Sequence, residues 1–266
     1  VMNQRRSGAL LGYVSIFINI VIGLLFTPFL VRMLGQDEYG LFSIVGSFAA
    51  YLAIMDLGLS DTVVRYVVRY QAHTDREGEE HFLGIMSVIY GLLSLCILGF
   101  GAVIYVYLPS FFETSLTEEQ VTSARTMFLI VLGNVWLTVL FNALSATIVA
   151  YQRFVLLRVL EMASRIVSTL ALCAVLLAGH KAIAVVAVTA TVNALIVIYK
   201  VVYALVKLKV RVRLGGTPWG EVFGILRFSS SIFIVVVVEF LYWKLDMVIL
   251  GIMLSPAVVA VYAIGM

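Results

Sequence analysis

Charged residues are scarce in this chain. Only 12% of its 266 residues are Asp, Glu, Lys or Arg, whereas 62% are hydrophobic, and the mean hydropathy is +1.08. An ordinary soluble domain carries about 25% charged residues. One water-soluble core cannot hide so many apolar side chains, so the composition excludes an ordinary soluble domain and indicates a membrane protein.

Cysteine and catalytic motifs are scarce as well. The two cysteines, Cys96 and Cys173, fall inside long apolar runs, where small packed side chains are expected rather than a disulfide or a metal site. Phosphate-loop, dinucleotide-binding and zinc-protease motifs are absent. No stretch between the apolar runs is long enough for a soluble catalytic domain. We therefore expect no enzyme activity and no cofactor, and no nucleic-acid partner.

Long apolar runs, by contrast, recur along the whole chain. Each run is about 20 residues or longer, which is enough to cross roughly 30 Å of hydrocarbon as a helix, and the period-two alternation of a barrel strand is missing. We predict an all-α polytopic membrane protein with seven transmembrane helices and the start of an eighth, in which the chain ends. The expected spans are 8–33, 40–63, 82–108, 124–150, 159–178, 182–206 and 222–252.

Basic residues lie mainly in alternate loops. With the N-terminus in the cytoplasm, the inner segments carry eleven Lys and Arg and the outer segments three, which is the bias expected at a cytoplasmic face. The inner residues are Arg5, Arg6, Arg65, Arg69, Arg76, Arg153, Arg158, Lys207, Lys209, Arg211 and Arg213, and the outer ones are Arg32, Arg125 and Lys181. We predict a multi-pass protein of a bacterial cytoplasmic (inner) membrane with a cytoplasmic N-terminus.

A weak internal repeat divides the chain. The exits of the first and seventh spans can be aligned at an offset of 220 residues, which places Leu34 opposite Leu254 and Ile44 opposite Ile264. Such a repeat indicates two halves related by an axis along the membrane normal, as in some secondary transporters. We predict a six-helix lobe over 1–206, a cytoplasmic basic linker over 207–221, and the start of a truncated second lobe over 222–266.

Three segments resemble a known family. They are RMLGQDEYGL (32–41), MDLGLS (55–60) followed by VVRY (63–66), and KLDMVILG (244–251). All three are similar to segments of polysaccharide and oligosaccharide flippases in the multidrug/oligosaccharidyl-lipid/polysaccharide exporter superfamily. The resemblance implies a two-lobe transporter that works by alternating access. Its substrate would be an oligosaccharide linked to undecaprenyl pyrophosphate, moved from the cytoplasmic to the outer leaflet for cell-surface polysaccharide synthesis.

The resemblance also implies partners and leaves alternatives. Coupling to H⁺ or Na⁺, contact with membrane lipids, and contact with polysaccharide polymerase or assembly proteins are expected, and we expect a monomer. An ion-coupled multidrug antiporter of the same superfamily is the first alternative. A membrane-embedded glycosyltransferase or polymerase is the second, and it is disfavoured because no long extramembrane loop carries catalytic carboxylates.

Ionisable residues inside apolar runs are the candidate functional residues, because a charge in hydrocarbon is costly. Asp56, near the inner end of the second span, is predicted either to carry a coupling proton or to pair with Arg65 or a neighbouring helix. Arg65 and Arg69 are four residues apart and share a helix face, where they would bind pyrophosphate or anchor the helix to lipid head groups.

The seventh span carries four further candidates. Glu239 and Asp246 are seven residues apart and so lie on one helix face, as cavity or coupling acids. Arg227 and Lys244 are candidate substrate cations, with interfacial anchoring as the alternative for each. Elsewhere, Glu161 and Arg165 are expected to form a local salt bridge, Lys200 to reach the interface, and Asn193 to make an interhelical hydrogen bond.

Overall fold

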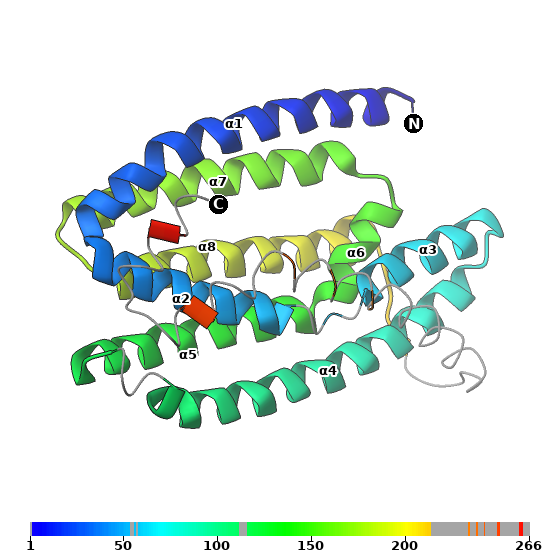
Figure 1. Ribbon diagram of the computed structural model, residues 1–266. Coiled ribbons are helices and arrows are strands. Elements are labelled where there is room, and N and C mark those ends of the chain that lie inside the picture. Colours follow the sequence, from blue (N-terminus) through cyan, green and yellow to red (C-terminus); the bar gives the residue numbers. More distant parts are fainter. Residues whose placement is uncertain are drawn as a thin grey trace.

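The described part of the protein is all-helical. The computed structural model describes residues 2–53, 56, 58–111 and 116–213, together with 234, 238, 242, 249–250 and 261–262; the side chains of 2–10, 49–53 and 111 are excepted. These residues form eight α-helices and no strand (Figure 1). Five helical stretches there are long and apolar enough to span a membrane: Leu11–Leu34, Arg76–Ser110, Glu118–Leu140, Phe154–Leu177 and Ala182–Lys207.

The helices pack in two connected groups. Helix α1 (Met2–Leu34) lies along α7 (Phe154–Leu177), which packs on α8 (Ala182–Val202). On its other side α8 contacts α5 (Glu118–Leu140), and α5 packs against α2 (Gln36–Ala53) and α4 (Arg76–Phe111). Aromatic and aliphatic side chains fill the core around α4 and α5, among them Phe82, Met86, Tyr90, Met127 and Phe128. The outer face of α1 exposes large apolar side chains, which suits contact with lipid.

Two expected spans are each divided into two helices. The predicted span 40–63 is wrong as a single helix, since α2 ends at Ala53 and α3 (Leu59–Ala72) begins after Gly58, whose φ is +68°. A left-handed residue cannot continue a right-handed helix, and glycine adopts it at little cost. The predicted span 124–150 is also interrupted, at Phe141 (φ −103°, ψ 10°), which separates α5 from α6 (Asn142–Ala150).

Two further boundaries are the start of α5 and the end of α4. Thr117 caps α5: its Oγ1 accepts from the N–H of Gln120 at 3.3 Å, and the Gln120 side chain accepts from the N–H of Thr117 at 3.0 Å. Pro109 does not end the third expected span, because α4 continues to Phe111. A proline removes only its own N–H from the helix, so it kinks the helix without obliging the next residues to leave it.

One end of the bundle gathers the turns that carry basic residues (Figure 1). The hydroxyl of Tyr151, after α6, donates to Glu79 Oε1 at the start of α4 (2.8 Å). After α8 and its π-helical turn η2 (Tyr203–Lys207), residues 208–213 run without helix along that same start of α4. The N–H of Arg213 donates to the Glu80 carbonyl (3.1 Å), and its guanidinium pairs with Glu77 (3.0 Å). The beginning of the expected 207–221 linker is therefore attached to α4.

At the opposite end of the bundle, Glu38 of α2 connects α2 to the beginning of α8. Oε2 of Glu38 accepts a hydrogen bond from the N–H of Ala182, the first residue of α8, at 3.2 Å. The α7–α8 turn contains Gly179, whose φ is +85°. The segment 32–41 thus holds α1, α2 and the beginning of α8 together at this end. The expected seventh and eighth spans, and the division into lobes at 207–221 and 222–266, involve residues outside the described ones.

Candidate functional site

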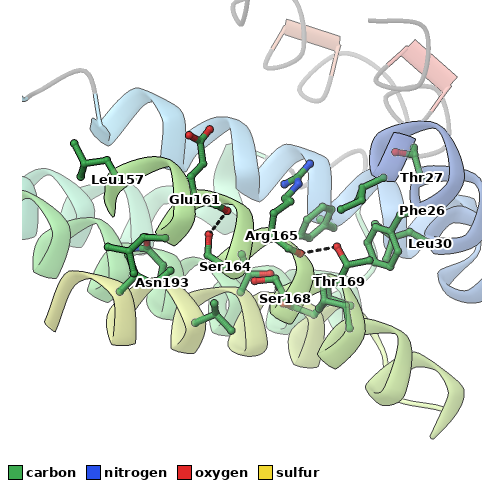
Figure 2. Close-up of a pocket in the computed structure, with 18 of the residues that line it drawn as sticks. Phe26, Thr27, Leu30, Leu157, Glu161, Ser164, Arg165, Ser168, Thr169 and Asn193 are labelled. Carbon is green, nitrogen blue, oxygen red and sulfur yellow. Dashed lines mark hydrogen bonds between the residues drawn. The ribbon is translucent and has the colours of Figure 1, made fainter. Parts of the chain in front are cut away.

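A cavity of about 670 Å³ lies between α1, α2, α7 and α8. Its apolar wall comes from α1 and α2 and includes Phe26, Leu30, Tyr39 and Phe42. Its polar wall comes from α7 and α8 (Figure 2). A concave site with an apolar wall and a few converging polar groups is the usual form of a small-ligand site. Three of the four lining helices, α1, α7 and α8, belong to the membrane-spanning candidates.

The polar wall of α7 is a stripe of residues three or four apart. Glu161, Ser164, Arg165, Ser168 and Thr169 all line the cavity, because side chains at this spacing share one face of a helix. The hydroxyls of Ser164 and Thr169 donate to carbonyls of their own helix, at 2.7 and 2.8 Å. Such back-bonding satisfies the hydroxyl donors in an apolar span while leaving oxygen lone pairs for a ligand.

The charges of the cavity are arranged differently from the prediction. Glu161 pairs with Arg158, whose Nη1 lies 2.7 Å from Glu161 Oε2, and the expected Glu161–Arg165 salt bridge is not formed. Positions three and four residues away are both neighbours on a helix, so the choice between the two arginines depends on side-chain packing. Arg165 keeps a guanidinium that makes no hydrogen bond or ion pair with the described residues, and it lines the cavity.

Lys200 of α8 supplies a second cation to the lining. It is partly buried and lines the cavity on the helix that faces α7. Lys200 and Arg165 together give the cavity two cationic side chains against one acid, and that acid is already paired with Arg158. The described lining therefore carries a net positive charge.

A hydrogen-bonded network connects this cavity to α5. Nδ2 of Asn134 donates to the carbonyl of Ala190 at 2.8 Å, and Nδ2 of Asn193 donates both to Asn134 Oδ1 and to Thr138 Oγ1, each at 2.9 Å. The prediction that Asn193 makes an interhelical hydrogen bond is confirmed. Asn193 also lines the cavity, which sequence reasoning missed.

Asp56 lies at the break between α2 and α3, outside the cavity lining. Its Oδ2 accepts from the hydroxyl and the N–H of Ser60, at 2.7 and 3.3 Å, and its Oδ1 accepts from Nδ2 of Asn142 at 2.6 Å. The predicted contact with a neighbouring helix is confirmed, and the partner is the first residue of α6. Tyr90, fully buried on α4, brings its hydroxyl close to Asp56 and Ser60 without a well-formed hydrogen bond.

Arg65 and Arg69 share an exposed face of α3, as their spacing predicts, and neither lines the cavity. Arg227, Glu239, Lys244 and Asp246 lie outside the described residues, so their roles stay predictions. No group of three or more His, Cys, Asp or Glu able to hold a metal ion occurs among the residues described.

The cavity residues Arg165 and Lys200 were not among the substrate candidates drawn from the sequence. A signal was present in α7, where polar residues recur every three or four positions within an apolar span. The sequence analysis treated Glu161 and Arg165 as a salt bridge with each other. In the structure Glu161 pairs with Arg158 instead, which leaves the charge of Arg165 available to a ligand.

The fold defines a class of protein: a multi-pass helical membrane protein with a polar, cationic cavity among its spans. A family model described as polysaccharide biosynthesis protein matches residues 6–265, which is nearly the whole chain. The chain belongs to this family, which is one of flippase-type transporters. The family to which segments 32–41, 55–66 and 244–251 pointed is thereby confirmed. Neither the curated proteins nor the solved structures yield a significant match.

Proposed function

We propose that the protein moves a lipid-linked oligosaccharide, carried on a polyprenyl pyrophosphate of the undecaprenyl type, from the cytoplasmic to the outer leaflet. Family membership supports transport in polysaccharide synthesis. The observation that carries the substrate class is the cavity, which combines unpaired cationic charge with hydroxyl and amide groups between membrane-spanning helices.

The chemistry of such a substrate requires these groups. A pyrophosphate is an anion that cannot cross roughly 30 Å of hydrocarbon unaided, and a sugar carries several hydroxyls that must keep hydrogen-bond partners. Arg165 can bind phosphate oxygens through its planar fork, and Lys200 adds a point charge. The hydroxyls of Ser164, Ser168, Thr169 and Thr189 offer oxygen acceptors along the same cavity.

The orientation in the membrane completes the proposal. Most of the basic residues lie at one end of the bundle, which contains the α3–α4 turn, the α6–α7 turn and residues 208–213. We therefore propose that this end faces the cytoplasm and that the protein lies in a bacterial inner membrane. Lys200 is near that end of α8. The cationic part of the cavity would then receive the pyrophosphate from the cytoplasmic leaflet. Alternating access, coupling to H⁺ or Na⁺ and contact with polymerase or assembly proteins belong to the same proposal.

The test is a deletion of the gene in its own host, followed by location of the lipid-linked oligosaccharide. In the deletion strain we expect the glycolipid to accumulate in the cytoplasmic leaflet. Expression of the protein from a plasmid should restore the glycolipid to the outer leaflet. Membrane vesicles of defined orientation, probed with a membrane-impermeant lectin or glycosidase, distinguish the leaflets. Undiminished outer-leaflet display in the deletion strain would rule the proposal out.

A further inference from the structure

We infer that Asn193 is a specificity residue of the cavity, whose side-chain oxygen accepts a hydrogen bond from a hydroxyl of the sugar next to the pyrophosphate. This inference rests on the proposed function. It goes further because it assigns a recognition role to a group that is neither charged nor a hydroxyl. The evidence is the way in which α5 holds the Asn193 amide.

The amide orientation of Asn134 is fixed first. The carbonyl of Ala190 can only accept a hydrogen bond, so the Asn134 atom 2.8 Å away must be the amide nitrogen. The other side of the same amide, Oδ1, is then an acceptor directed at α8. This assignment needs only the chemistry of a backbone carbonyl.

The orientation of Asn193 follows from that of Asn134. The atom of Asn193 that lies 2.9 Å from Asn134 Oδ1 must be a donor, so it is Nδ2. The same nitrogen donates to Thr138 Oγ1 at 2.9 Å, while the Thr138 hydroxyl itself donates to the carbonyl of Asn134 at 2.8 Å. Both amide hydrogens of Asn193 are therefore used within the protein.

Only the oxygen of this amide is left for a ligand. Oδ1 of Asn193 makes no hydrogen bond with the described residues, and Asn193 lines the cavity opposite the polar face of α7 (Figure 2). A side chain fixed in this way is an acceptor that cannot turn to become a donor. It would repel a phosphate oxygen and would attract a hydroxyl.

The position of Asn193 relative to Lys200 suits a sugar beside a pyrophosphate. The two residues are seven apart on α8, so they share a face and lie about two turns, roughly 10 Å, from each other along the helix. A ligand whose anion is held at Lys200 and Arg165 would therefore place its next group near Asn193. The cavity would then bind both the pyrophosphate and the first sugar attached to it.

The test compares two probes bound to the purified protein in nanodiscs. One probe is undecaprenyl pyrophosphate, and the other is the same lipid carrying a single hexose. The variants are Asn193→Thr, whose shorter hydroxyl can still donate to Asn134, and Asn193→Leu. Thr191→Val is the matched control, since Thr191 is on the same helix, donates only to the carbonyl of Ala187, and does not line the cavity.

We expect the wild-type protein to bind the hexose-bearing lipid about five- to tenfold more tightly than the bare lipid, the amount that one hydrogen bond supplies. Asn193→Thr should abolish this preference and leave the dissociation constant for bare undecaprenyl pyrophosphate unchanged. Thr191→Val should keep the preference. Thermal unfolding of each variant checks that the fold is intact.

Two results would overturn the inference. A preference retained in both Asn193 variants would show that this oxygen does not recognise the sugar, and equal losses for the two probes would show that Asn193 serves packing only. If the wild-type protein binds and moves the glycolipid, either result removes the inference and leaves the proposed function standing. If the wild-type protein binds neither probe, the proposed function falls as well.

Discussion

Asn142 donates a hydrogen bond of 2.6 Å to Asp56 across 86 residues of sequence, and it joins two breaks in the helices. Helix α2 packs on α5, and α3 packs on α6, so the bond lies where the four half-spans meet. A carboxylate in such a position is stabilised by the amide of Asn142 and by the N–H of Ser60 at the start of α3. The arrangement explains how an acid is tolerated between apolar segments.

The first prediction concerns this bond. Asn142→Leu should lower the free energy of unfolding by about 1.5–3 kcal/mol, because it removes a hydrogen bond to a charged acceptor. The double variant Asp56→Asn with Asn142→Asp should recover most of the loss, since it exchanges the partners and keeps the bond. Thermal and denaturant unfolding in detergent measure both effects. If the loss of unfolding free energy in the double variant equals the sum of the losses in Asp56→Asn and Asn142→Asp, the bond contributes nothing to stability.

The second prediction concerns the cavity cations. Arg165→Ala and Lys200→Ala should each reduce transport of the lipid-linked oligosaccharide about tenfold or more, because each removes a charge-assisted contact to phosphate. Arg165→Lys should fall between, since lysine keeps the charge but not the planar fork. Lys207→Ala is the matched control, because Lys207 is a nearby cation that does not line the cavity. Full transport by both alanine variants at equal expression would exclude these residues from substrate binding.

A third prediction covers the candidates of the expected seventh span. Glu239→Gln and Arg227→Ala should both lower translocation at equal expression, measured by the same leaflet assay in the complemented deletion strain. Each removes a charge that is costly to keep within a membrane span without a functional reason. Wild-type translocation by both variants would assign these residues to anchoring or packing.

The fourth prediction tests how α8 is capped from α2. Glu38→Ala should lower the free energy of unfolding by about 1 kcal/mol, since the N–H of Ala182 loses its acceptor at the helix N-terminus. Glu38→Gln should cost less, because a glutamine oxygen still accepts. The ion pair with Lys181 adds little, because its atoms are 4.0 Å apart and the lysine is largely exposed. Equal losses in the two variants would mean that charge, not capping, is what matters.

The fifth prediction is a pH dependence at the opposite end. Burial, together with the hydrogen bond to the Glu79 carboxylate, raises the pKa of Tyr151 to about 12, from about 10 in an unfolded chain. A raised pKa gives a stability contribution that is complete below about pH 10 and is lost as the pH rises to about 12. The difference in unfolding temperature between wild type and Tyr151→Phe should shrink over that interval. A constant difference would contradict it.

Five of the expected spans, 8–33, 82–108, 124–150, 159–178 and 182–206, coincide with long apolar helical stretches, because hydropathy marks them. The breaks within the expected spans 40–63 and 124–150 were not predictable in this way. Gly58 gave a partial signal, since glycine permits the left-handed conformation that ends a helix. Phe141 gave none, because neither phenylalanine nor the following asparagine disfavours a helix strongly. The break there is compensated by Asp56, which lies far away in sequence, and such a compensation exists only in the folded chain.

The cavity shows a similar limit. The polar stripe of α7 can be found by counting residues, but the sequence does not say which helix the stripe faces. Glu161 had two arginines at equivalent helical distances, Arg158 and Arg165, and only packing decides which of them it neutralises. The orientation of the Asn193 amide is even harder to predict from the sequence. It depends on Asn134 and Thr138 of α5 and on the backbone carbonyl of Ala190 in α8.

The attachment of residues 208–213 to α4 has a consequence for these residues themselves. The chain leaves α8 through its π-helical turn, and the hydrogen bond from Arg213 to Glu80 fixes it again at the start of α4. Residues 208–213 are thus held at both ends, and closing such a loop restricts their conformational freedom. Removing the Arg213–Glu77 pair would leave the backbone hydrogen bond to Glu80 as the remaining attachment of Arg213 to α4.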